Sequence, residues 1–98
     1  MDEVEQTPTE PAAVWDDFEG LYLTVRRTLA EASARSITDA EQCLWQARSG
    51  RVKRLRAMLN PDDLPQVLEA IAVLHAEREA ATASIVSQLA VADTRSHR

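Results

Sequence analysis

The sequence predicts an all-α protein: a small helical bundle with a long helix, a short or bent helix and a second long helix. Glycine occurs only twice in 98 residues, and apolar residues recur at spacings of three and four along most of the chain. Runs of β-branched residues are absent, which argues against strands. A chain of this length forms one domain with a modest core, so we expect dimerisation or a partner to complete the bundle.

The first helix is predicted from Pro11 to Ala34. Residues 1–10 precede it as a charged segment with little to bury, and we expect a disordered acidic tail there. Thr9 is a suitable cap, and proline fits the first turn. The core-facing stripe consists of residues that recur every three or four positions: Trp15, Phe18, Tyr22, Val25, Leu29 and Ala32. Leu23 lies off this stripe, so it is either exposed or part of a second contact face.

The second helical region follows a predicted capping box, with Thr38 as cap and Glu41 reaching back, and runs to Leu59. Gly50 leaves its continuity open. A continuous helix places Arg48 and Arg51 in the apolar stripe, which is costly unless they pair with acids across an interface. A bend or break at Gly50 lets the arginines reach water, and we favour this alternative slightly.

The third helix should begin after the turn of Asn60-Pro61 and run from about Asp63 to Val91. Leu64, Leu68, Ile71, Ile85 and Leu89 mark its apolar seam. The same register places three polar residues on the seam, which predicts a buried polar centre formed by His75, Arg78 and Thr82. We expect this helix to pack antiparallel to the first. The helical domain is expected to span residues 11–92, with a frayed polar tail at residues 93–98.

Charge is distributed unevenly. The segment from Gln42 to Pro61 contains no acidic residue and five basic ones, whereas the first nineteen residues hold seven acids and the net charge is −5. Because its acidic and basic residues lie in separate segments, the chain is suited to orienting against another charged surface. The basic segment and its apolar neighbours are therefore the predicted partner-binding residues: Arg48, Arg51, Arg54, Arg56, Trp45 and Leu55.

Several kinds of chemistry are not predicted. The sequence has no phosphate-binding glycine loop, no serine-nucleophile motif and no paired catalytic carboxylates. Ala72 stands where a Glu-x-x-His metal motif ending at His75 needs its glutamate, so we expect no metal site and no cofactor. The single cysteine, Cys43, fits a reducing cytoplasm, and no apolar stretch reaches membrane-spanning length.

The leading expectation is a non-enzymatic protein–protein interaction module: a small adaptor, chaperone or inhibitor that binds another protein and forms a homodimer. Its alanine-rich, arginine-rich and lysine-poor composition favours a bacterial or phage origin. One alternative is a nucleic-acid-binding dimer that uses residues 48–56, where the cations would contact phosphates. A second alternative is a small helical enzyme that uses His75 and Arg78 in the bundle centre.

Overall fold

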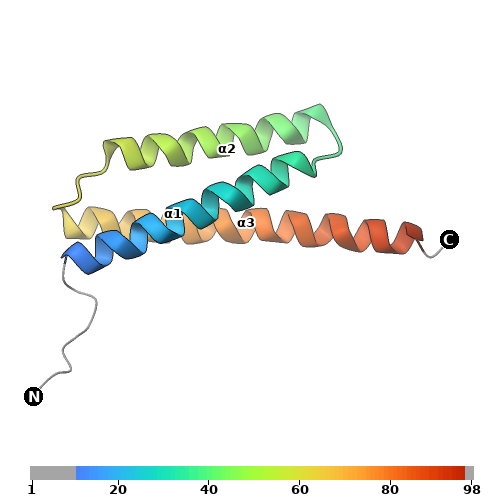
Figure 1. Ribbon diagram of the computed structural model, residues 1–98. Helices are drawn as coiled ribbons and strands as arrows, with labels where there is room; N and C mark the ends of the chain where they lie inside the picture. Colours follow the sequence, from blue (N-terminus) through green and yellow to red (C-terminus); the bar gives the residue numbers. More distant parts are fainter. Residues whose placement is uncertain (1–10, 97–98) are drawn as a thin grey trace, which may run out of the picture.

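The structure, a computed structural model, describes residues 11–96 and contains three helices over that range (Figure 1). They are α1 (Pro11–Ala34), α2 (Asp39–Met58) and α3 (Leu64–Ser96). The predicted all-helical class is confirmed for this part of the chain, and α1 has its predicted bounds. α3 continues past the predicted end at Val91, into part of the predicted tail. The acidic segment of residues 1–10 and the Thr9 cap lie outside the described residues.

Both connections between helices are fixed by side-chain caps. The Thr38 hydroxyl accepts a hydrogen bond from the Glu41 N–H at 3.1 Å, and the Glu41 carboxylate accepts one from the Ile37 N–H at 3.2 Å. The predicted capping box is therefore present, with its reciprocal bond one residue earlier than expected. At the start of α3, Asp63 Oδ1 accepts from the Gln66 N–H at 3.1 Å, so Asp63 is the cap rather than the first helical residue.

α2 is continuous through Gly50, and the favoured bend or break is wrong. Gly50 has an ordinary helical backbone with no positive φ angle. Arg48 pairs with Glu77 of α3, as the paired alternative requires, whereas Arg51 is exposed to solvent and needs no partner.

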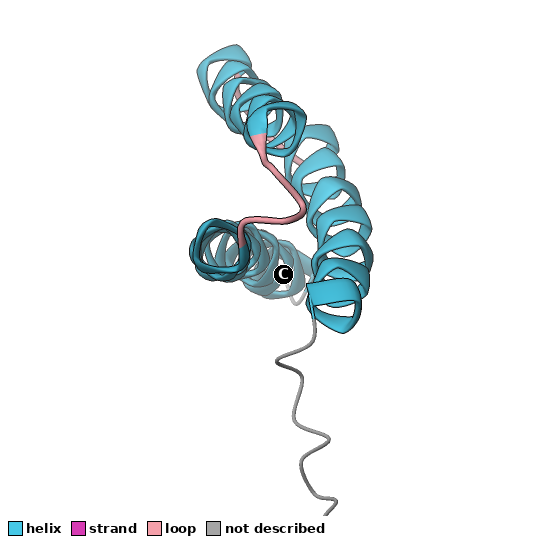
Figure 2. Ribbon diagram, turned by 90° about the vertical axis from the view of Figure 1, so that its left-hand side faces the viewer, coloured by secondary structure: helices cyan, strands magenta, loops and turns pink. Residues whose placement is uncertain are grey.

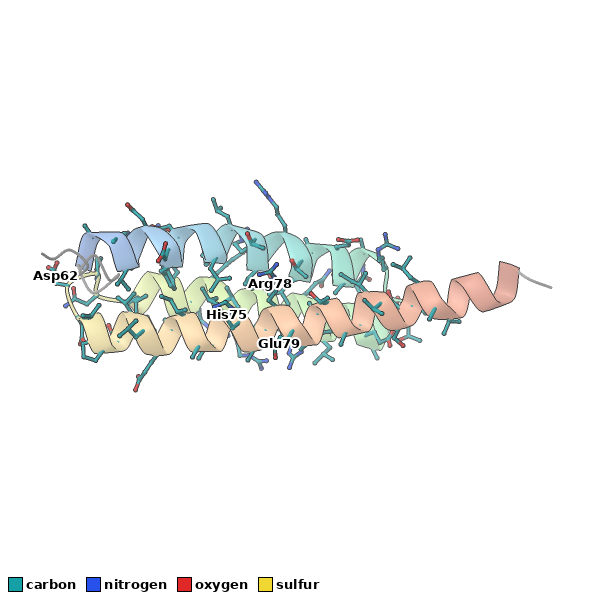
Figure 3. All side chains as sticks on the ribbon, turned by 90° about the horizontal axis from the view of Figure 1, so that it is seen from below. Asp62, His75, Arg78 and Glu79 are labelled. Carbon is teal, nitrogen blue, oxygen red and sulfur yellow. The ribbon has the colours of Figure 1, made fainter. Side chains whose placement is uncertain are left out.

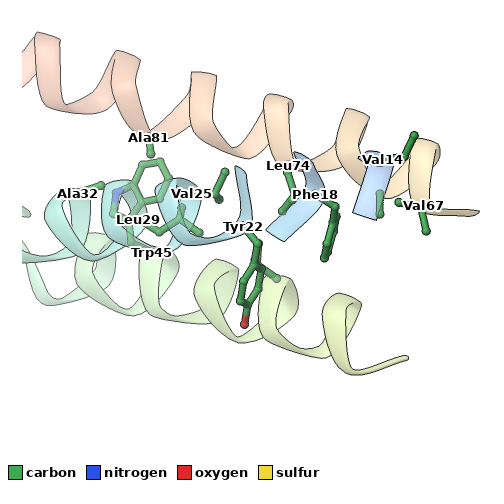
Figure 4. Close-up of a cluster of buried hydrophobic side chains, with 12 residues drawn as sticks. Val14, Phe18, Tyr22, Val25, Leu29, Ala32, Trp45, Val67, Leu74 and Ala81 are labelled. Atoms are coloured by element: carbon green, nitrogen blue, oxygen red, sulfur yellow. The ribbon is translucent and has the colours of Figure 1, made fainter. Parts of the chain in front are cut away.

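α1 is the central helix, and α2 and α3 both pack on it while touching one another at few positions. Two successive reversals of the chain make α1 and α3 parallel, so the predicted antiparallel packing of these helices is wrong (Figure 1). The core shows the same direction: Val14 of α1 lies near Val67 of α3, and Ala32 lies near Ala81 (Figure 4). Short connections place sequential neighbours antiparallel, and this fixes the direction of the third helix.

The core is a single row of apolar side chains between the helices (Figure 4). α1 contributes half of the buried residues, and the predicted stripe is buried except for Trp15, which is half-buried. The buried residues are Val14, Phe18, Tyr22, Val25, Leu29 and Ala32 of α1, Trp45 and Val52 of α2, and Val67, Ala70, Leu74 and Ala81 of α3. In α3 the buried stripe thus runs beside the predicted seam instead of along it.

The molecule is thin and elongated, with dimensions of 61 × 31 × 15 Å. Its radius of gyration is 17.0 Å, against about 13 Å for a compact domain of this length. Seen along the helices, α2 and α3 lie on different parts of the α1 surface (Figure 2). A layer of this kind leaves large helical faces uncovered.

Candidate protein-interaction surfaces

Arg48 lies inside the fold rather than on a free basic patch. Its Nε is 3.5 Å from Glu77 Oε1 on α3, and its guanidinium carbon is 5.0 Å from the ring centroid of Trp45. The side chains of Arg48 and Glu77 are only 28% and 15% exposed. This pair is a bridge between α2 and α3, which otherwise meet little.

Arg56 performs the equivalent role towards α1. Its Nε donates to Glu19 Oε1 at 2.9 Å, and a second guanidinium nitrogen donates to Glu19 Oε2, so the pair is bidentate. The guanidinium also lies 5.3 Å from the Tyr22 ring centroid and 6.0 Å from that of Trp15. The hydrogen bonds from Glu19 raise the pKa of Arg56, and the charge of Glu19 adds to the effect while partial desolvation opposes it.

The predicted partner-binding set is therefore divided. Arg51 and Arg54 are exposed, as a binding surface requires. Trp45 is buried and Leu55 is half-buried against the core, so both stabilise the monomer. The charge run in the sequence combines two arginines that hold the helices together with two that face solvent.

The residues expected to form a buried polar centre are exposed in the single chain. His75, Arg78 and Thr82 lie along one side of α3, where Glu79 and Ala83 complete the lining of a shallow depression of about 430 Å³ (Figure 3). The single chain does not bury them, because α3 turns its neighbouring stripe of Val67, Ala70, Leu74 and Ala81 towards α1, and their burial in an assembly stays a prediction.

A groove lies between α1 and α2, and Trp45 is the one predicted partner-binding residue that lines it. It has a volume of about 550 Å³, and its apolar lining includes the buried Leu29 and Trp45 and the exposed Leu23. Three cations line it as well: Arg26 and Arg27 from α1 and Lys53 from α2. The remaining lining residues are Ala30, Ser33, Gln46 and Ser49, so none of the groove residues is acidic. We call this surface the basic groove.

One feature of the sequence does point to the basic groove. Leu23 lies off the apolar stripe of α1, and two arginines follow it within one helical turn. An apolar residue beside cations on the outer face of a helix is typical of a contact surface. Lys53 joins these residues only through the antiparallel packing of α1 and α2.

Within residues 11–96, no group of three or more histidine, cysteine, aspartate or glutamate side chains is placed to hold a metal ion. None of the three helices is long and apolar enough to cross a membrane. Comparison of the chain with protein-family models, curated proteins and solved structures finds no match.

Proposed function

We propose that the chain is a non-enzymatic protein-binding module of the adaptor, chaperone or inhibitor class, and that the basic groove binds an acidic amphipathic helix of its partner. The observation that carries the proposal is the composition of the groove: an apolar lining, three cations and no acidic side chain. A partner helix with leucines on one face and glutamates beside them matches both properties.

The geometry of the groove suits a helix better than a small metabolite. The groove is formed along the line where two helices meet, and its cations come from both helices. A helix lying along this line would cover Leu23, which is 53% exposed, and place its acids near Arg26 and Lys53. Burial of the leucine stabilises the complex, while the charges orient the partner and accelerate encounter.

The test uses a fluorescent helical peptide built from glutamate and leucine, with leucines at positions i, i+3 and i+7. Fluorescence anisotropy measures its dissociation constant with the wild type and with Arg26→Glu/Lys53→Glu. We expect a weakening of about tenfold or more, because two attractive charges become repulsive. The matched control, Arg51→Glu/Arg54→Glu, makes the same change in net charge outside the groove and should weaken binding far less.

Equal weakening by the two variants would show that net charge, rather than the basic groove, governs binding. A larger effect of the control would move the site to the outer face of α2. A DNA duplex serves as the second probe. If it binds with a steep salt dependence and the peptide does not bind, the nucleic-acid alternative replaces the proposal.

A further inference from the structure

One face of α3 carries a heptad repeat that the chain itself covers only in part. Starting at Leu64, the positions alternate in steps of four and three, and this spacing continues for eight positions to Leu89. The apolar members are Leu64, Leu68, Ile71, Ile85 and Leu89. His75, Arg78 and Thr82 occupy the three central positions. We call this face the heptad stripe.

The heptad stripe runs beside the fully buried side of α3 and shares an edge with it. The core uses the adjacent positions Val67, Leu74 and Ala81 instead. On the heptad stripe, Leu68 is 50% exposed and Leu89 is 48% exposed. Leu64, Ile71 and Ile85 are half-buried at the edge of the monomer core, so the exposed part of the heptad stripe is its outer edge, with Leu68 and Leu89.

α1 widens the uncovered face. Leu21 is half-buried and lies about 200° around α1 from Glu19, whose carboxylate binds Arg56 of α2. Leu21 therefore lies on the flank of α1 away from α2. The heptad stripe also avoids α2, since Glu77, which pairs with Arg48, is on the other flank of α3. In Figure 3 His75 and Arg78 are seen from the side of α3 opposite α2.

The sequence of the heptad stripe identifies its occupant, because the pattern matches its own reversal at six of its eight positions, the exception being Ile71 opposite Thr82. When a second copy runs antiparallel with its polar centre opposite this one, apolar residues meet apolar residues at both ends and polar residues meet in the middle. The resulting pairs are Leu64 with Leu89, Leu68 with Ile85, Ile71 with Thr82, and His75 with Arg78, each formed twice.

A parallel arrangement is disfavoured by charge. In register, it would place Arg78 against Arg78 of the second copy, which is repulsive. The antiparallel arrangement separates the two arginines along the helix axis and brings each within reach of Glu79 of the second copy, which flanks the heptad stripe. It also opposes the helix dipoles.

We propose that the chain forms an antiparallel homodimer through the heptad stripe, with α1 and α3 of each copy completing a four-helix core. This interface also explains the length of α3, which extends past the ends of α1 and α2 (Figure 1). In the dimer this extension packs on the first turns of α3 of the second copy. The proposal uses a different face from the basic groove and stands independently of it.

Light scattering after gel filtration tests the proposal. The full chain should elute with twice the mass of one chain, and Leu68→Lys/Leu89→Lys should elute as a monomer with unchanged helical circular dichroism. The matched control is Val73→Lys/Val91→Lys, which changes two exposed residues on another face of α3 and should remain dimeric. A monomeric wild type, or dissociation by the control variant alone, would overturn the proposal.

The direction of pairing has its own test. In a Cys43→Ser background, which removes the single cysteine, two variants are prepared separately: Leu68→Cys and Ile85→Cys. After they are mixed and oxidised, the antiparallel register yields the mixed disulfide, because position 68 lies opposite position 85. A parallel register would link each variant to itself, and that pattern would refute the proposed arrangement.

Discussion

At the residue scale, Glu77 carries a charge on the core-facing side of α3. Its Oε1 is buried and accepts no hydrogen bond, although Arg48 Nε lies 3.5 Å away. The ion pair offsets the desolvation of the carboxylate without fully satisfying it. Arg48 is therefore needed to compensate the buried carboxylate of Glu77. The pair fixes the position of α2 relative to α3, but it adds little to the free energy of folding.

Arg48→Met should lower the free energy of unfolding by about 1–2 kcal/mol, because it leaves the Glu77 carboxylate buried without a counter-charge. Arg48→Met/Glu77→Met should recover most of this loss, since two methionines fill the space with apolar contacts. Urea denaturation followed by circular dichroism measures both variants. If the double variant is as unstable as the single one, the pair itself is the stabilising element.

Arg56 differs from Arg48 because its partner is fully engaged. Both oxygens of Glu19 accept from the guanidinium, and this raises the pKa of Arg56 above its usual range. A cation whose pKa is raised on folding stabilises the fold at every pH below its unfolded pKa, and this contribution is lost only as the pH rises through the raised value. Deprotonation of Arg56 therefore does not weaken the fold near neutrality.

At the element scale, each glycine lies inside a helix that does not require it. A Cβ built on Gly20 meets no atom within 4 Å, and one on Gly50 meets only a terminal nitrogen of Arg54 at 3.6 Å. Neither glycine has a positive φ angle. Both positions therefore tolerate alanine. Each glycine lowers the stability of its helix through its backbone entropy, although the backbone at that position does not require a glycine.

Gly50→Ala should raise the free energy of unfolding by about 0.5–1 kcal/mol, because alanine favours a continuous helix. Gly20→Ala, in the middle of α1, is the control and should give a similar gain in the free energy of unfolding. Thermal denaturation measures both variants. A loss of stability at Gly50 together with a gain at Gly20 would show that α2 bends at Gly50.

The elements were predictable where local chemistry decides them. The extent of α1 follows from its apolar period and the start of α2 from the Thr38 cap, and both signals depend on residues close together in the sequence. The continuity of α2 was not predictable, because the acid that pairs with Arg48 is Glu77, which is distant in the sequence. In α3 two apolar stripes lie side by side, and periodicity alone does not tell which one faces α1.

At the scale of the whole molecule, α2 is the helix that packs least against the other two. Its buried anchors are Trp45 and Val52, and its remaining attachments include the ion pairs of Arg48 and Arg56. α1 and α3 share a longer interface. An arrangement with one peripheral helix favours opening of that helix before the rest unfolds.

Native-state hydrogen exchange should therefore detect a partial opening of α2. We expect its amides to exchange at a lower opening free energy than those of α1 and the first half of α3, and the difference should grow at 1 M salt, which screens the ion pairs. Mass spectrometry of peptic fragments locates the exchange. Equal protection of all three helices would mean that the molecule unfolds as one unit.

The residues of the candidate site were harder to predict from the sequence than the helices were. The basic groove joins Arg26 and Arg27 to Lys53, and only the packing of α1 against α2 places them together. The basic segment contains no acid and therefore predicts free arginines, yet acids of other helices pair with Arg48 and Arg56. A charge count along the chain cannot show which cations remain available in three dimensions.

The two arginines that hold α2 also cover the two tryptophans. Arg48 lies over Trp45 in the first half of α2, and Arg56 lies near Trp15, beside the last turn of α2. Each half of α2 thus has its own intrinsic fluorophore. With Trp15→Phe and Trp45→Phe variants, changes in emission wavelength and lifetime would reveal which end of the helix separates first, without any attached dye.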